Sequence, residues 1–318
     1  MIYKSRKSND LRLSAVGLFT KEFGDMSEIQ GIVPPMVTPF THDGDVNLEA
    51  IQPDVRYLLS VGVHGLAVCG STGEGHTLTT EETRAITEVT VEAVGGRVPV
   101  ITGIITDSTA GSVERGKAVA DLGVAALQVT PVHYLFRPTD DAMVAHFRTL
   151  TEETGLPVMI YNVVPWTYLS PHLLDRIMSE VDGVIGVKQS AGDMKLLADL
   201  LVSSERKGRI MTAVDALLYP SFVLGAHGAI AAVLTAAPAL CVKVWDAVVA
   251  GDHAKAKATH EKLLGIWNAI NQDNLPANVK CAMRLQGRDG GEPRPPMPAS
   301  SPEQEAQVRS ALTAAGLL

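Results

Sequence analysis

From residue 32 onward, short apolar runs alternate with longer stretches in which apolar residues recur at helical spacing. The short runs are rich in valine and isoleucine and lie at residues 32–40, 65–70, 98–104, 126–131, 156–163, 183–189, 209–214 and 228–234. Largely continuous apolar runs of this length are typical of strands that are buried on both faces, as in a parallel sheet. The pattern therefore predicts eight such strands.

The stretches between these runs carry signals for helix starts. Thr79 and Glu82 have the spacing of a capping box, and Ser170-Pro171 supplies an N-cap residue followed by a proline at the first helical position. Pro53 lies inside the first helical pattern, where a proline lacks the N–H group that a helix interior needs. We expect a kinked helix or a late helix start there.

Eight strand-like runs, each followed by a helical stretch, predict an α/β fold, specifically a (β/α)8 TIM barrel over residues 28–250. Residues 251–318 are expected to add C-terminal helices packed on the barrel, the last one starting at Ser301-Pro302 and ending before Gly316. An open doubly wound sheet is the alternative, but no glycine-rich phosphate fingerprint follows the first strand. Residues 1–27 have no convincing signal-peptide pattern and are expected to form an extension outside the barrel.

Composition and charge exclude several classes of function. The chain has a formal net charge of −8 without a lysine/arginine run, which argues against nucleic-acid binding. No apolar run approaches the roughly 18–20 residues of a membrane span. Cys69, Cys241 and Cys281 form neither a metal-ligand pattern nor a disulfide framework, and the nine histidines show no metal spacing. We expect no metal site and a reducing compartment, the cytoplasm.

Candidate chemistry lies where the predicted strands end, because active sites of such barrels form at the carboxyl ends of the strands. The second strand leads into the sequence GSTGEG at residues 70–75, and the fourth leads into His133 and Tyr134. The fifth strand ends at Tyr161 and the sixth at Lys188. These polar groups come from distant parts of the chain and are expected to meet at the barrel mouth, the edge where the carboxyl ends of the strands lie.

Lys188 is the most informative of these residues. A lysine at the inner end of a barrel strand is partly desolvated, and desolvation favours the neutral amine, which is the nucleophile. A neutral amine attacks a ketone and forms a Schiff base. The alternative is a strand-end lysine paired with a carboxylate. Tyr161 is able to pass protons or is a core residue, and the glycine-rich turn either binds a carboxylate through its N–H groups or is a plain loop.

Several motifs, taken in order, resemble those of the dihydrodipicolinate synthase / N-acetylneuraminate lyase family. They are GIVPPMVTPF, GSTGE, VTP, IYNV, GVIGVKQSAGD and GAHGAIAAV, and the resemblance covers about residues 28–318. It implies a (β/α)8 barrel with extra C-terminal helices, a homotetramer or dimer, and Schiff-base chemistry on pyruvate or a related 2-oxo acid. It implies no metal or organic cofactor beyond the covalent imine.

The resemblance also implies roles for single residues. Lys188 matches the Schiff-base lysine, Tyr161 matches the proton-shuttling tyrosine, and Ser71 matches a Thr or Ser of a hydroxyl relay. The residues expected to hold the 2-oxo acid are Ser71, Thr72, Gly73 and Ile230.

Two departures from the family pattern concern the second substrate. Only Tyr134 is available where many synthases have a tyrosine pair, one of which reaches a neighbouring subunit, and His133 is an alternative for that place. Trp166 or Thr167 stands where the synthases have an arginine that grips the second substrate's carboxylate. An indole does not replace a bidentate carboxylate clamp. We therefore expect a second substrate other than aspartate semialdehyde, bearing hydroxyls or an apolar group, with Trp166 beside it.

The leading hypothesis is a 2-oxo acid lyase, an aldolase or dehydratase, with Lys188, Tyr161, Ser71 and Tyr134 as catalytic residues. One alternative is a 4-hydroxy-tetrahydrodipicolinate synthase that binds the second carboxylate through Arg137. A second alternative is a catalytically silent 2-oxo acid binding protein. Trp245 and Trp267 are expected to pack between helices.

Overall fold

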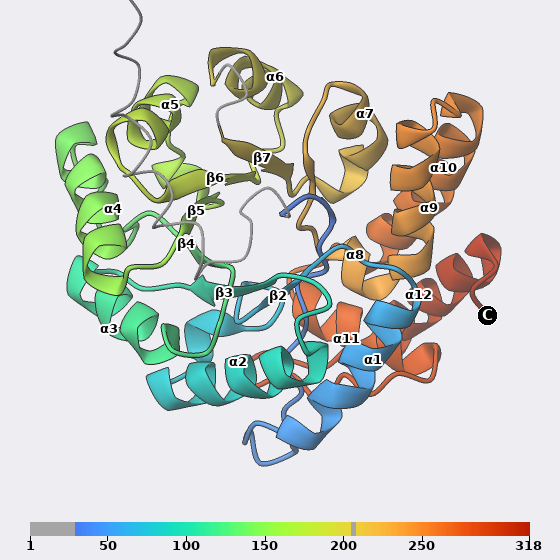
Figure 1. Ribbon diagram of the computed structural model, residues 1–318. Helices are drawn as coiled ribbons and strands as arrows, with labels where there is room; N and C mark the ends of the chain where they lie inside the picture. Colours follow the sequence, from blue (N-terminus) through green and yellow to red (C-terminus); the bar gives the residue numbers. More distant parts are fainter. Residues whose placement is uncertain (1–28, 205–207) are drawn as a thin grey trace, which may run out of the picture.

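Eight parallel strands with helices between them form the centre of the protein (Figure 1). The computed structural model describes residues 29–204 and 208–318, so the expected extension at residues 1–27 lies outside the described part. The strands are β1 (Gly31–Ile32), β2 (Leu66–Val68), β3 (Val100–Ile104), β4 (Ala126–Val129), β5 (Val158–Asn162), β6 (Val184–Gln189), β7 (Arg209–Thr212) and β8 (Gly228–Ala229). Their order in the sheet is β1-β8-β7-β6-β5-β4-β3-β2.

The two ends of this strand order approach each other. Past β1, Pro35 forms a parallel bridge with Ala67 of β2. The N–H of Met36 donates to the carbonyl of Ala67 over 2.8 Å, and the N–H of Ala67 donates to the carbonyl of Pro34 over 3.0 Å. The first strand is shorter than the predicted run 32–40, because Pro34 and Pro35 have no N–H groups to offer to a neighbouring strand.

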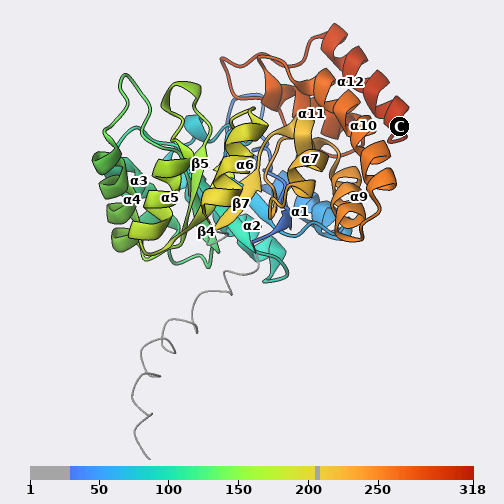
Figure 2. The same ribbon diagram turned by 90° about the horizontal axis from the view of Figure 1, so that it is seen from above.

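Helices surround the strands on the outside (Figures 1 and 2). They are α1 (Ile51–Ser60), α2 (Thr80–Val94), α3 (Thr109–Val119), α4 (Asp140–Thr154), α5 (Pro171–Glu180), α6 (Met194–Ser203), α7 (Leu218–Val223), α8 (Val233–Ala236), α9 (Pro238–Val249), α10 (His253–Ile270), α11 (Leu275–Leu285) and α12 (Pro302–Ala315). The prediction of eight parallel strands with helical connections and further C-terminal helices is confirmed.

The predicted helix starts are also confirmed. Thr79 and Glu82 form a reciprocal capping box at α2. The hydroxyl of Ser170 accepts from the N–H of Leu173 at the start of α5. Pro53 lies in the first turn of α1, where N–H groups have no acceptor within the helix, so the proline removes no helical hydrogen bond. The first helix therefore starts late, as one of the two expected outcomes.

The predicted strand at 228–234 is wrong in its second half. Strand β8 ends at Ala229, and α8 begins at Val233. The N–H of Val233 donates to a carboxylate oxygen of Asp215 over 2.6 Å, which satisfies a backbone group at the start of this short helix. A run of small apolar residues does not distinguish a buried strand from a buried helix by its pattern alone.

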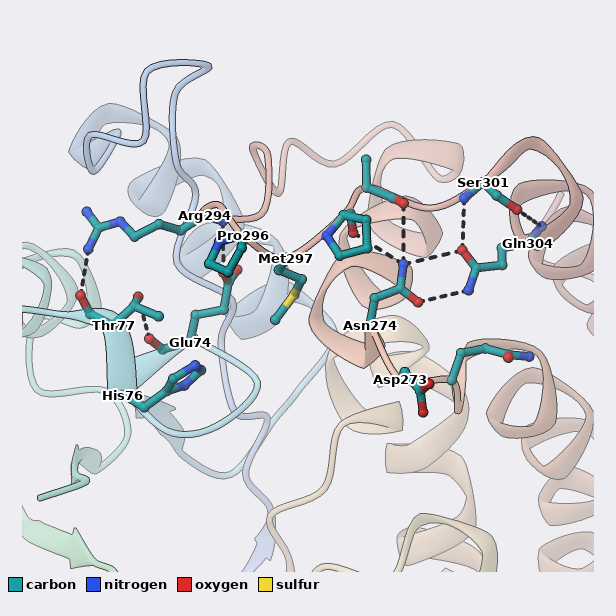
Figure 3. A pocket seen from close by; sticks show the side chains of 13 residues that line it. Glu74, His76, Thr77, Asp273, Asn274, Arg294, Pro296, Met297, Ser301 and Gln304 are labelled. Carbon is teal, nitrogen blue, oxygen red and sulfur yellow. Dashed lines mark hydrogen bonds between the residues drawn. The ribbon is translucent and has the colours of Figure 1, made fainter. Parts of the chain in front are cut away.

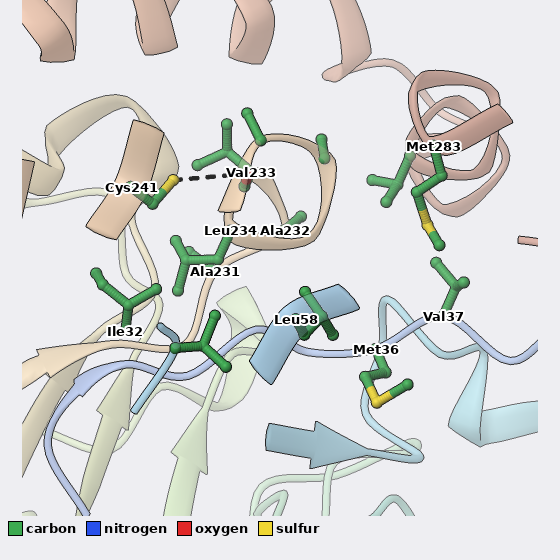
Figure 4. Close-up of a cluster of buried hydrophobic side chains, with 14 of the residues drawn as sticks. Ile32, Met36, Val37, Leu58, Ala231, Ala232, Val233, Leu234, Cys241 and Met283 are labelled. Atoms are coloured by element: carbon green, nitrogen blue, oxygen red, sulfur yellow. Dashed lines mark hydrogen bonds between the residues drawn. The ribbon is translucent and has the colours of Figure 1, made fainter. Parts of the chain in front are cut away.

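The apolar core continues from the strands into the C-terminal helices. One cluster of buried side chains includes Ile32 of β1, Leu58 of α1 and Met283 of α11 (Figure 4). A smaller cluster consists of residues in or next to the strands, among them Ile101 of β3 and Met159 of β5. No helix within residues 29–204 and 208–318 is long and apolar enough to cross a membrane.

Candidate active site

Lys188 and Tyr161 lie side by side at the ends of neighbouring strands. They are register partners in the pairing of β5 with β6, and both side chains are buried. The Nζ atom of Lys188 lies 3.7 Å from the centroid of the Tyr161 ring. Among the described residues, no carboxylate oxygen forms an ion pair with Lys188 within 4.0 Å, and its charged neighbour in the cavity is Asp215, whose pKa the Lys188 charge lowers.

Tyr161 connects Lys188 to the glycine-rich turn. Its phenol donates a hydrogen bond to the hydroxyl oxygen of Ser71 over 3.1 Å. Ser71 follows β2, so the contact joins residues that are 90 positions apart in the chain. The predicted convergence of Lys188, Tyr161 and Ser71 is thus present in the fold.

The turn at residues 70–75 is closely packed against the neighbouring backbone. The hydroxyl of Thr38 donates to the carbonyl of Gly73 over 2.6 Å. A Cβ atom on Gly73 would lie 2.8 Å from the carbonyl oxygen of Met36, and one on Gly75 would lie 1.9 Å from that of Cys69. Both positions therefore require glycine, because a larger side chain would collide with the protein's own backbone whether or not a ligand binds to the turn.

A buried ion pair fixes the same turn from behind. Glu74 has no exposed surface, and its carboxylate accepts from Lys280 Nζ of α11 over 2.7 Å. Its second oxygen accepts from the N–H of Arg294 over 2.9 Å, on a segment that also contacts Thr77 (Figure 3). Lys280 also donates to the carbonyl of Glu292. Burial lowers the pKa of Lys280, whereas the Glu74 carboxylate opposes that shift.

The candidate active site is a cavity of about 380 Å³ at the ends of β2, β5, β6 and β7. This volume lies in the usual range of small-molecule sites. Its polar lining consists of Ser71, Thr72, Tyr161, Lys188, Ser190 and Asp215. Its apolar and glycine lining consists of Val163, Gly192, Ala213, Val214, Ala216, Ile230, Ala231, Ala232, Trp267, Leu275 and Pro276.

Two polar residues of this cavity are absent from the sequence prediction. Burial raises the pKa of Asp215 to about 7, against the opposing effects of backbone hydrogen bonds and of Lys188. The hydroxyl oxygen of Ser190 is buried and has no hydrogen-bond partner among the described residues. Ser190 follows β6 directly, and Asp215 lies shortly after the end of β7 at Thr212, so the strand-end rule that identified Lys188 also applies to them.

Trp267 also lines the cavity, although the sequence predicts only that it packs between helices. It belongs to α10 and lies in the cavity wall with Leu275 and Pro276 of α11. No sequence motif marks these residues, since their place depends on how the C-terminal helices pack beside the barrel mouth.

Tyr134 and Trp166 lie outside the cavity lining in the described chain. Their exposed fractions are 65% and 69%. The indole N–H of Trp166 donates to the carbonyl of His133 over 2.9 Å, so the loops after β4 and β5 contact each other. Arg137 is also outside the lining and lies 3.8 Å from the Asp140 carboxylate.

A second cavity, of about 530 Å³, lies between residues 74–77 and the segment 294–304 (Figure 3). Neither Lys188 nor Tyr161 lines it. The Asn274 and Gln304 side chains in its wall bond to each other, and Asn274 also donates to the carbonyls of Pro298 and Ala299. This cavity therefore lies behind the glycine-rich turn and outside the strand-end site.

Comparison with known proteins supports the family suggested by the motifs. The model of the Dihydrodipicolinate synthetase family matches residues 28–315. The 4-hydroxy-tetrahydrodipicolinate synthase of Methanopyrus kandleri is 32% identical over 294 residues, which is 92% of this chain and 98% of the relative. That of Bacillus subtilis is 32% identical over 281 residues, 87% of this chain and 96% of the relative.

A solved structure gives the same result. YagE, a prophage protein belonging to the dihydrodipicolinic acid synthase family from E. coli K12, in complex with pyruvate, superposes with a TM-score of 0.87. It is 27% identical and covers 91% of this chain and 99% of its own. The chain therefore belongs to the dihydrodipicolinate synthetase family and is an enzyme of the lysine Schiff-base, class I aldolase type.

Proposed function

We propose that the protein is a lyase that forms an imine between Lys188 and pyruvate or a related 2-oxo acid. The observation that carries the proposal is the connected set in one cavity: Lys188 Nζ over the Tyr161 ring, and Tyr161 bonded to Ser71. The pyruvate bound in the YagE structure supports the same class of substrate.

In the proposed reaction, the Lys188 amine attacks the ketone carbon of the 2-oxo acid and water leaves. The protonated imine draws electrons from the adjacent carbon, which allows a carbon–carbon or carbon–oxygen bond to form or break. Tyr161 transfers protons at the reacting atoms, and its hydrogen bond to Ser71 extends this path. The reaction requires no metal or organic cofactor.

The turn after β2 is proposed to hold the carboxylate of the 2-oxo acid. The N–H groups of Ser71 and Thr72 are the donors, and Gly73 allows the turn its compact form. Ile230 provides an apolar wall for the three-carbon unit. Because residues 70–75 are fixed by Glu74 and Lys280, these donors are positioned before the substrate binds.

The remaining proposals concern the assembly and the site's outer residues. We propose a (β/α)8 barrel at residues 28–250 carrying C-terminal helices at 251–318, in a cytoplasmic homotetramer or dimer. The predicted role of Tyr134 in catalysis depends on that assembly, because in the single chain it faces solvent. The same holds for Trp166 as a substrate-binding residue.

A 4-hydroxy-tetrahydrodipicolinate synthase is the second candidate function, favoured by the names of the relatives. That reaction joins pyruvate to aspartate semialdehyde, which carries a second carboxylate. Arg137, the residue predicted to bind that carboxylate, lies outside the cavity lining beside Asp140. We therefore favour a lyase with a different second substrate over the synthase, and the synthase over a catalytically silent 2-oxo acid binding protein.

Borohydride trapping tests the proposal. The protein is incubated with pyruvate and borohydride, digested and examined by mass spectrometry. We expect a reduced pyruvate adduct on the peptide that contains Lys188, and none in the Lys188→Ala variant. Lys195 is a matched control, because its exposed ammonium pairs with Asp199. A folded protein without an adduct on Lys188 contradicts the proposal, and unchanged turnover in Lys188→Ala does so as well.

A further inference from the structure

The lining of the candidate active site contains both polar and apolar residues. Lys188, Tyr161, Ser71 and Thr72 suffice for the carboxylate and ketone of a 2-oxo acid, and Ser190 and Asp215 are the further polar residues. The larger apolar side chains outside the proposed pyruvate site, called the apolar wall, are Val163, Val214, Trp267, Leu275 and Pro276. A second reactant that enters this cavity has these apolar side chains available for contact.

The charges in the cavity do not suit an anionic second reactant. Among the described residues of the lining, Lys188 is the single lysine or arginine, and the proposed reaction uses its amine. Asp215 is the single carboxylic acid in the described part of that lining, and one of its oxygens already accepts from the N–H of Val233. A carboxylate moved from water into this apolar wall loses hydration without gaining a cationic partner.

We infer that the second reactant is an uncharged apolar aldehyde, and that Trp267, Leu275 and Pro276 select it. This inference rests on the proposed function, and it names the substrate class of that site. An indole beside two aliphatic side chains offers a large apolar contact area and a ring face for an aryl group. The selecting residues come from α10 and α11, outside the strand-and-loop motifs that carry the Schiff-base chemistry.

The reaction balances without any further reactant. The Lys188 amine and pyruvate form the imine and release water, and loss of a C3 proton gives the enamine. The enamine carbon attacks the aldehyde carbon, and the resulting alkoxide takes up a proton. Water then hydrolyses the imine and frees Lys188. The product is a 4-hydroxy-2-oxo acid whose fourth carbon carries the apolar group, and the reverse direction is the corresponding cleavage.

The test compares acceptors of different charge in the same assay. Pyruvate is paired with benzaldehyde, with glyceraldehyde or with aspartate semialdehyde, and kcat/KM is measured for each acceptor. We expect benzaldehyde to exceed aspartate semialdehyde at least tenfold. Borohydride trapping of pyruvate on Lys188 is run in parallel, because it reports the Schiff base independently of the acceptor.

Two variants and a control locate the selectivity. Trp267→Leu is expected to lower kcat/KM for benzaldehyde at least fivefold while pyruvate trapping is unchanged. Val163→Arg adds the missing cation to the apolar wall and is expected to shift preference toward aspartate semialdehyde. Val249→Arg, on an exposed position of α9 outside the lining, is the matched control and should leave all acceptors unchanged.

The outcomes separate the two proposals. Failure to trap pyruvate on Lys188 overturns the proposed function and the inference with it. Successful trapping with equal or higher kcat/KM for aspartate semialdehyde overturns the inference alone. Trapping together with the expected benzaldehyde preference, reversed or weakened by Val163→Arg, supports both.

Discussion

Two loops at the same barrel mouth differ in how they are held. The turn at residues 70–75 is largely buried, and Glu74 ties it to Lys280 and Arg294 of the C-terminal part. The loop at residues 131–137 places Tyr134, Leu135 and Phe136 in solvent, and Leu135 is 87% exposed. Both loops follow a strand of the same sheet, so the difference arises from what packs against each loop.

The comparison indicates which part of the site is complete in one chain. The proposed carboxylate-binding role of the 70–75 turn requires N–H groups that are held in place before the ligand arrives, and the Glu74–Lys280 ion pair holds this turn. Three consecutive exposed large apolar side chains are typical of a surface that meets another molecule. We therefore expect the 131–137 loop to be a contact surface of the proposed homotetramer or dimer. The 70–75 turn, in contrast, is held by contacts within its own chain.

The largest expected effect is at the ion pair. Lys280→Met leaves the Glu74 carboxylate buried without its cation, which typically costs about 3–5 kcal/mol. The free energy of unfolding, measured in urea, is expected to fall by that amount. Lys117→Met breaks an exposed pair with Glu153 and should cost at most about 1 kcal/mol.

A double variant makes this comparison sharper. Glu74→Gln with Lys280→Met removes both buried charges and should recover part of the stability lost in Lys280→Met. Equal losses for Lys280→Met and Lys117→Met would show that the turn is held by other contacts.

The second expected effect depends on pH and concerns the helices that support the exposed loop. His146 of α4 is buried, its Nδ1 lies 3.0 Å from the Thr109 hydroxyl of α3, and burial lowers its pKa to about 4. Unfolded histidine has a pKa near 6.5, so between these values the unfolded chain binds the extra proton. The contribution of neutral His146 to the free energy of unfolding is therefore fully present above pH 6.5. It is lost as pH falls toward 4, by up to about 3 kcal/mol.

Urea midpoints of the wild type and His146→Gln, measured from pH 4 to 7, test this effect. The stability difference between the two proteins should change across that range in the stated direction. His42→Gln, at an exposed position, is the control and should change the urea midpoint at pH 7 less than His146→Gln does. A pH-independent difference for His146→Gln would mean that burial does not perturb this imidazole.

The smallest expected effect lies in the exposed loop itself. Leu135 has a φ of 66°, in the left-handed region that disfavours leucine and that asparagine tolerates better. Leu135→Asn is expected to raise the free energy of unfolding by about 0.5–1 kcal/mol in thermal or urea denaturation. Phe136→Asn, at the next position, should change it by less than about 0.5 kcal/mol. Equal effects at both positions would argue against backbone strain at Leu135.

The sequence identifies the strands and the inner part of the site because both depend on short-range patterns. Lys188, Tyr161 and Ser71 each stand at a strand end, and parallel strands bring such ends together. Trp267 is not found this way, because its contact with the cavity depends on the packing of α10 beside the barrel mouth. Strand β8 is predicted too long, because small apolar residues fit a buried strand and the short helix α8 equally well.

The Glu74–Lys280 pair also bears on the order in which the protein matures during synthesis. Its two residues are 206 positions apart, so a nascent chain that has emerged through β8 already contains Lys188, Tyr161 and Ser71. It still lacks the ammonium that compensates the buried Glu74, and contacts between such distant residues form late in folding. Completion of the proposed substrate-binding turn thus waits for α11 to leave the ribosome.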